Sequence, residues 1–144
     1  MMTATWAPGP NMSTARAAPG LAALGGKLYV VGGDNGHGVA FTSVEVLDPA
    51  TASPVWESGA SLRTARTDFG LAALGGKLYA VGGCCSLATV EVLDTSSSSP
   101  AWRPGPSLEV ARSLLGLAAL GGKLYAAGGQ TTSGDALSSV EVLD

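Results

Sequence analysis

The sequence predicts an all-β protein built from repeated copies of one small antiparallel sheet. The decapeptide GLAALGGKLY occurs three times without change, at residues 20–29, 70–79 and 116–125. Of the 144 residues, 21 are glycine and only 13% are charged, whereas 46% are hydrophobic, which is typical of a compact chain with many tight turns. A segment that cannot bury its apolar surface alone can bury it against copies of itself, so the repetition predicts stacked structural units.

The repeat unit is also marked by tryptophan. Trp6, Trp56 and Trp102 lie 50 and then 46 residues apart, and each unit ends with the pentapeptide VEVLD. We therefore expect a single domain over residues 1–144. Its three repeats are expected at about residues 6–55, 56–101 and 102–144.

The first unit shows how the strands of one sheet follow from the sequence. The pair Gly25-Gly26 separates two short β-prone runs, residues 20–24 and 27–31, which is typical of a hairpin with a two-residue turn. A third strand is expected over residues 43–48, and a fourth begins near Trp56. Four antiparallel strands per unit make a sheet of the size of a propeller blade.

The register of this hairpin places small residues opposite large ones. Gly20 is expected opposite Val31, and Ala22 opposite Tyr29. This taper suits a first strand that lies innermost, where sheets crowd towards a common axis. The same register brings a lysine near the last aspartate of each unit, and such exposed pairs add little stability. The expected pairs are Lys27 with Asp48, Lys77 with Asp94, and Lys123 with Asp144.

These segments resemble a known repeat. The runs GLAALGGKLYVVGG and VEVLDPATASPVW are similar to the kelch repeat, which is marked by a double glycine after the second strand and a tryptophan in the fourth. The resemblance implies kelch-type β-propeller blades. In the third strand the family usually has an aromatic residue where this chain has leucine, which implies a thinner contact there. The leucines are Leu47, Leu93 and Leu143.

The number of blades raises a question of closure. Closed propellers use about 4 to 8 blades, so three blades make half or a fragment of one. In one interpretation two copies form a six-bladed homodimer, each chain lending its strand at Trp6 to the third blade of the other. In the other, equally weighted, the chain is a piece of a longer kelch protein. In both cases three blades alone would expose large apolar faces.

Charge and cysteine content exclude several function classes. The net charge of −3 gives no general attraction for a phosphate backbone, so we expect no nucleic-acid partner. The sequence has neither a secretory leader nor an apolar run long enough for a membrane span, which predicts a soluble, cytoplasmic protein. The neighbouring Cys84 and Cys85 are interpreted as reduced loop thiols.

Residues that could support catalysis are scarce, so no catalytic residue, metal or cofactor is predicted. His37 is the only histidine, and the copper site of galactose-oxidase-like kelch propellers therefore has no basis here. The repeated carboxylates of the third strands are expected to be architectural. A small-molecule or sugar-processing kelch enzyme is retained as the alternative function.

The first candidate binding residues are three repeated arginines, Arg16, Arg66 and Arg112, which each lie nine residues before the first hairpin glycine. In adaptor-type kelch propellers, arginines here line a face that grips acidic peptide segments, which implies binding of an acidic protein partner. A structural role, in which each arginine bonds backbone carbonyls of a neighbouring loop, is left open beside it.

The second candidates are loop residues, because the loops between the second and third strands differ most among units. These loops span residues 34–41, 84–88 and 130–137, and Asp34, Asn35 and His37 are the candidate contacts in the first. The predicted function is a non-catalytic protein–protein interaction module, of the kelch scaffold or substrate-receptor type.

Overall fold

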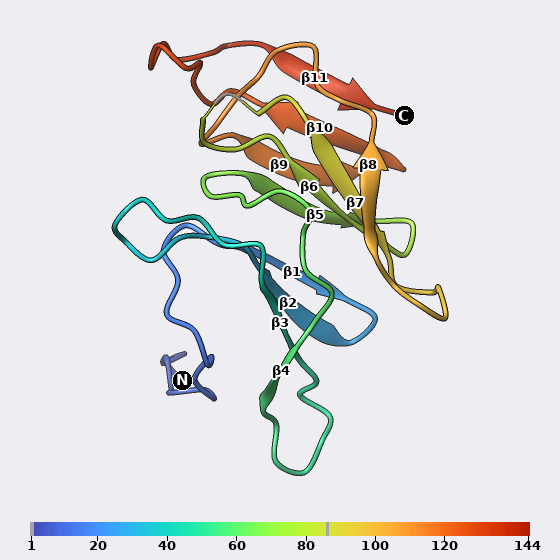
Figure 1. The fold of residues 1–144 in the computed structure, drawn as a ribbon. Helices are drawn as coiled ribbons and strands as arrows, with labels where there is room; N and C mark the ends of the chain where they lie inside the picture. Colours follow the sequence, from blue (N-terminus) through green and yellow to red (C-terminus); the bar gives the residue numbers. More distant parts are fainter. Residues whose placement is uncertain (1, 86) are drawn as a thin grey trace.

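The computed structural model describes residues 2–85 and 87–144, and these fold into three antiparallel sheets that lie side by side (Figure 1). Ser86, within the predicted loop 84–88, lies outside the described residues. We call the sheets blades 1, 2 and 3 in chain order. The described ranges contain no helix long and apolar enough to cross a membrane.

Each blade is a meander in which strands that follow one another in the chain are neighbours in the sheet. Blade 1 contains β1 (Gly20–Leu24), β2 (Lys27–Val31), β3 (Val44–Leu47) and β4 (Trp56–Ser58). Blade 2 contains β5 (Gly70–Leu74), β6 (Lys77–Val81), β7 (Val90–Asp94) and β8 (Trp102–Gly105). Blade 3 contains β9 (Gly116–Leu120), β10 (Lys123–Ala127) and β11 (Val140–Leu143).

The predicted all-β class and the four-stranded blade are confirmed in blades 1 and 2, while the described part of blade 3 has three strands with β11 at its edge. The strand expected at Trp6 does not form within a single chain. Residues 6–9 are not in a strand, and the Trp6 side chain is fully exposed. The blades are offset by one strand from the predicted repeats, because Trp56 begins the last strand of blade 1.

The predicted hairpin register is confirmed. Gly20 pairs with Val31 and Ala22 with Tyr29, around a turn in which Gly25 and Gly26 have φ angles of +58° and +75°. Both turn residues are in the left-handed region, where glycine is favoured and the twist of the hairpin matches that of its strands. Two of the predicted rim pairs form, Lys77 with Asp94 at 3.9 Å and Lys123 with Asp144 at 2.5 Å.

The first strands of the blades stack on one another and form the inner edge of the assembly. β1 contacts β5, and β5 contacts β9. A Cβ added to Gly20 would lie 2.7 Å from Cβ of Leu71, and one added to Gly70 would lie 2.6 Å from Cβ of Leu117. Glycine is therefore required at these positions because the neighbouring blade approaches too closely for a side chain. This confirms the predicted wedge geometry.

The hydrophobic core lies between the blades. One cluster joins blades 1 and 2, and a second joins blades 2 and 3. Blade 2 is covered on both faces, so Leu78 and Ala80 have no solvent exposure. The outer faces of the row lack such cover, and Leu21 of blade 1 and Val140 of blade 3 remain 60% and 52% exposed.

Candidate functional site

Each of the three repeated arginines forms an ion pair with a glutamate of its own blade. Each guanidinium meets the glutamate at the second position of VEVLD. The pairs join Arg16 to Glu45 at 3.1 Å, Arg66 to Glu91 at 3.1 Å, and Arg112 to Glu141 at 2.9 Å. All three arginine side chains have no solvent exposure.

Two backbone carbonyls and a hydroxyl accept further N–H groups of the guanidinium, as blade 2 shows. Arg66 Nη1 donates to the carbonyls of Gly82 at 2.8 Å and Thr89 at 2.9 Å, and Nη2 donates to the Thr89 hydroxyl at 2.9 Å. The carboxylate of Glu91 in turn accepts the backbone N–H of Arg63 at 2.7 Å. The pair therefore connects the double glycine, the start of the third strand and the loop before the first strand.

The electrostatics of these glutamates follow from the same contacts. Burial raises the pKa of Glu45, but hydrogen bonds from Ser13 and from Arg16 outweigh burial and hold the pKa below its usual value. Burial likewise raises the pKa of Glu141, and the backbone N–H groups of Glu109 and Val110 together with Arg112 lower it overall. Both side chains are therefore charged at neutral pH.

The geometry supports the structural role for the arginines, which the sequence had left open. An acidic peptide would reach Arg66 only by displacing Glu91 and two carbonyl groups from a buried site. Acidic-partner binding by these arginines stays a prediction that no contact in the structure supports. The glutamate partners were expected only to be architectural. Their recurrence at the period of the arginines was the signal that could have paired them.

The loop candidates lie on one rim, which we call the loop face and define as residues 34–41, 84–85, 87–88 and 130–137. Asp34 bridges two blades, because its Oδ2 accepts the Thr67 hydroxyl at 2.7 Å. This bond, followed by the backbone N–H of Gly36, lowers the pKa of Asp34. Asn35 Oδ1 accepts the N–H of His37 at 2.9 Å and orders the loop, while His37 itself is exposed.

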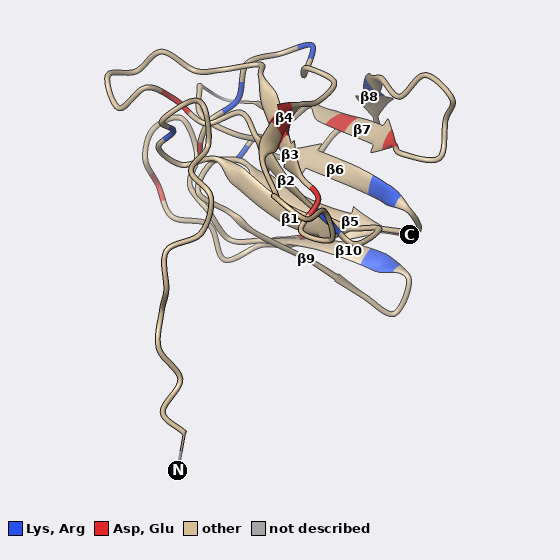
Figure 2. Ribbon diagram, turned by 90° about the horizontal axis from the view of Figure 1, so that it is seen from below, with Lys and Arg blue, Asp and Glu red and all other residues tan. Residues whose placement is uncertain are grey.

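The opposite rim carries the hairpins. Figure 2 shows the lysines of β6 and β10 in blue at the ends of their strands, and these ends are the hairpin ends, away from the loop face. Lys77 and Lys123 are the residues concerned, and each is paired with an aspartate.

Two grooves cross the loop face at the junctions between blades. The first, of about 380 Å³, lies between blades 1 and 2, and Asp34, Thr67 and Asp68 line it together with both cysteines. The second, of about 270 Å³, lies between blades 2 and 3 and is lined by the same cysteines and the third loop. Each groove combines the variable loop of one blade with the segment that enters the next blade.

Cys84 and Cys85 lie where the two grooves meet. Both are free, and their Sγ atoms are 3.2 Å apart, which confirms neighbouring unlinked thiols in a loop. The hydrogen bond with Cys85, followed by burial, raises the pKa of Cys84. Within residues 2–85 and 87–144, no three His, Cys, Asp or Glu side chains converge to hold a metal ion.

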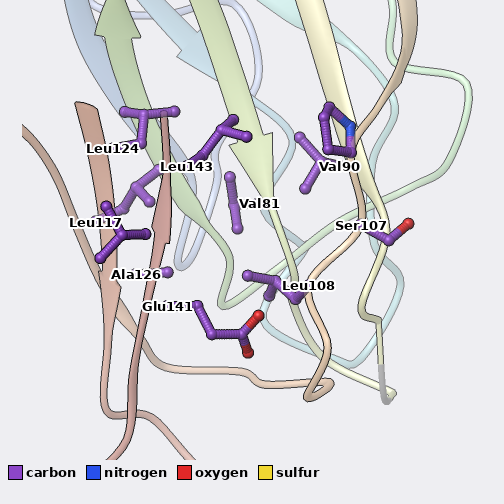
Figure 3. Close-up of a pocket in the computed structure, with 11 residues that line it drawn as sticks. Val81, Val90, Ser107, Leu108, Leu117, Leu124, Ala126, Glu141 and Leu143 are labelled. Carbon is purple, nitrogen blue, oxygen red and sulfur yellow. The ribbon is translucent and has the colours of Figure 1, made fainter. Parts of the chain in front are cut away.

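A smaller apolar pocket of about 80 Å³ lies between blades 2 and 3 (Figure 3). Leu117 and Leu124 of blade 3 and Val81 and Val90 of blade 2 line its walls, and Leu143 of the edge strand β11 closes one side. This pocket offers no cluster of reactive groups and belongs to the contact between blades.

Antiparallel meanders that stack side by side through their first strands define the class as a β-propeller, of which the described residues form a three-blade sector. The kelch motif matches three successive segments, residues 15–63, 65–109 and 111–144. The chain therefore belongs to the kelch-repeat family.

A solved structure titled "Structure of YjhT" is similar to the chain, with a TM-score of 0.81 at 15% sequence identity. The match covers 95% of this chain and 48% of that chain, so this chain spans about half the length of the protein it matches. At this identity the likeness concerns the fold alone. No curated protein sequence matches the chain.

Proposed function

We propose that the chain is a non-catalytic protein-interaction module in which kelch blades form a rigid scaffold and the loop face makes the contact. The observation that carries the proposal is the pair of grooves at the blade junctions, because each is lined by the most variable loops of the chain. The buried arginine–glutamate pairs hold the bases of these loops, so the grooves are lined by loops with rigidly anchored ends. A cytoplasmic setting is part of the proposal, and unlinked neighbouring thiols suit it.

The chemistry of the first groove indicates the kind of partner. Two aspartates, Asp34 and Asp68, line it, and none of its described lining residues is basic. Because hydrogen bonds lower the pKa of Asp34, that carboxylate keeps its charge at neutral pH. We therefore propose a partner segment with lysine or arginine side chains, in place of the acidic segment expected when the arginines were assigned to binding.

The test compares two synthetic peptide pools, one basic and one acidic, for binding to the purified chain. Asp68→Asn removes one groove charge with little change of shape, and asparagine tolerates the φ angle of +55° at this position. We expect about 5-fold weaker capture of basic peptides, since one partly screened charge contributes about 1 kcal/mol. Asp135→Asn, in the third loop and outside this groove, is the matched control. A preference for the acidic pool would refute the proposed partner class.

A measurement of substrate turnover distinguishes the enzyme alternative from the interaction module. The repeated glutamates are engaged in buried ion pairs, so they are not available as a free acid and base. Turnover of a small-molecule or sugar substrate by the purified chain, lost on substitution of a groove residue, would favour the enzyme instead.

Self-association is the second part of the proposal. The exposed outer faces of blades 1 and 3 support a homodimer that completes a six-bladed ring, within the range of closed propellers. The expected mass in solution is twice 14.2 kDa. A chain that stays monomeric at all concentrations would remove this part and leave the loop face untouched.

A further inference from the structure

The contacts that join each blade to the next recur along the row. At each end of the row, residues that make such a contact in the other blades have no partner blade to contact. One such contact is made by the tryptophan of the fourth strand. Trp56 Nε1 donates to the carbonyl of Pro10 at 2.9 Å, and Trp102 Nε1 donates to the carbonyl of Ala60 at 2.8 Å. Each acceptor lies four residues after the tryptophan of the preceding unit. The next acceptor in this series is the carbonyl of Pro106, and the tryptophan left over is Trp6, which is fully exposed.

The fourth strand itself is the second unmatched element. β4 pairs with β3 and β8 pairs with β7, whereas β11 is an edge. The sequence WAPGP at residues 6–10 differs from WRPGP at residues 102–106, which contains β8, at one position only. Residues 6–10 thus carry the sequence of a fourth strand.

The surface of β11 shows what such a strand would cover. In blade 2, Gly105 lies over Val90 and Val92, and a Cβ there would be 2.7 Å from Val92 Cγ2. Val90 is consequently 4% exposed. The equivalent Val140 and Val142 of β11 are 52% and 50% exposed, and the equivalent glycine, Gly9, has nothing within 4 Å.

The stacking of the inner strands leaves a third unmatched pair. Gly20 lies beneath Leu71 of blade 2, and Gly70 lies beneath Leu117 of blade 3. The corresponding glycine of blade 3, Gly116, has its nearest neighbour 3.8 Å from an added Cβ. The corresponding leucine of blade 1 is Leu21, which is 60% exposed.

A backbone bond repeats the same pattern at the loop face. Gly33 N–H donates to the carbonyl of Arg66 at 2.8 Å, and Gly83 N–H donates to that of Arg112 at 2.9 Å. The next donor is Gly129 in blade 3, and the carbonyl left over is that of Arg16, ahead of blade 1. All four series run in one direction, from a blade to the one that follows it.

We propose that a second copy of the chain docks residues 6–10 as the fourth strand of blade 3. The register of β7 with β8 sets Trp6 of the incoming copy opposite Leu143, with its indole N–H on the Pro106 carbonyl. Leu21 of the incoming copy then covers Gly116. The N-terminal segment and blade 1 of each copy contact blade 3 of the other copy. Two copies therefore exchange strands reciprocally and close a ring of six blades. This inference rests on the self-association part of the proposed function.

The described residues of one chain cannot fill both unmatched ends of the row, and a second copy carries the matching segments. Blade 2 lies between blades 1 and 3, and both of its faces are already covered (Figure 1). The N-terminal segment lies beside blade 1, on the opposite side of the row from β11. Two lengths of this chain also equal about one length of the solved structure that it matches, since 95% of the chain covers 48% of that structure.

The first test measures the mass of the purified chain by analytical ultracentrifugation over a concentration series. Trp6→Ala is expected to raise the dissociation constant of the dimer at least 100-fold, as for a tryptophan hot spot. Val39→Ala is the control, because Val39 is 57% exposed but takes part in none of these repeated contacts. A dimer that Trp6→Ala leaves unchanged would overturn the docking while leaving self-association intact.

The second test blocks the other end without touching Trp6. Gly116→Val has room in a single chain, because little surrounds Gly116, but it would meet Leu21 of the incoming copy. We expect the Gly116→Val chain to be folded by circular dichroism and monomeric by analytical ultracentrifugation. An equimolar mixture of Trp6→Ala and Gly116→Val chains is expected to associate where each alone is monomeric, because one interface of the pair then carries neither substitution. Failure of the mixture to associate, or a dimeric Gly116→Val chain, would overturn the strand exchange.

Discussion

The buried arginine of blade 2 gives the most direct test of the frame. Arg66→Met keeps the aliphatic length of the side chain but removes every guanidinium donor. Glu91, which is 4% exposed, then loses its cation, and the carbonyls of Gly82 and Thr89 lose their donor. Removing one partner of a buried ion pair costs about 3–5 kcal/mol, against a typical total stability of about 5–15 kcal/mol.

The assay is equilibrium unfolding in urea, with the free energy of unfolding extrapolated to water. Arg63→Met is the matched control, because the Arg63 side chain is exposed and only its backbone N–H contacts Glu91. The control is expected to change stability by less than about 0.5 kcal/mol. Adding Glu91→Gln to Arg66→Met neutralises the orphaned charge, so the double variant is expected to lose less than the sum of the two single losses.

The same variants decide between the two roles of the arginines. If Arg66→Met unfolded within about 1 kcal/mol of the parent chain but lost capture of an acidic peptide, the structural account would be refuted. In that case the guanidinium would have to leave its buried position to meet the partner.

Two further predictions concern blade spacing and pH. Gly70→Ala places a Cβ 2.6 Å from Leu117 Cβ and should lower the free energy of unfolding by about 1–3 kcal/mol. Gly116→Ala, measured at dilutions where single chains prevail, should lower the free energy of unfolding far less. Equal losses for the two variants would contradict the wedge geometry. The pKa values of Glu45 and Glu141 are lowered in the folded chain, so their stabilisation is fully present above the unfolded value of about 4.3 and is lost as pH falls through the folded value. Urea midpoints should therefore decline below about pH 4.3, and a constant midpoint down to pH 3 would speak against these charges.

Local features of the fold could be predicted from the sequence because they depend on neighbours in the chain. The Gly25-Gly26 turn fixes the pairing of Gly20 with Val31 through backbone conformation alone. The kelch resemblance likewise rests on short runs of residues, and the family match confirms it.

The environment of the arginines could not be predicted in this way. Arg66 meets Glu91 across 25 residues of chain, and its burial depends on the loop that folds over it. The sequence showed both residues in every repeat but gave no distance between them. The acidity of the first groove was missed for the same reason, since Asp34 and Asp68 belong to different blades and meet only at the junction.

The double glycine that follows the second strand has a consequence for how such chains grow. A side chain at Gly32 would lie 2.5 Å from the Arg66 carbonyl, so the base of the first loop is sealed by the backbone of the succeeding unit. Each unit thus packs against the loop base of the unit before it, and its own loop base packs against the unit after it. Duplication of a repeat in the gene can lengthen the row by one whole blade. The last blade then again lacks a following blade, until the row closes into a ring.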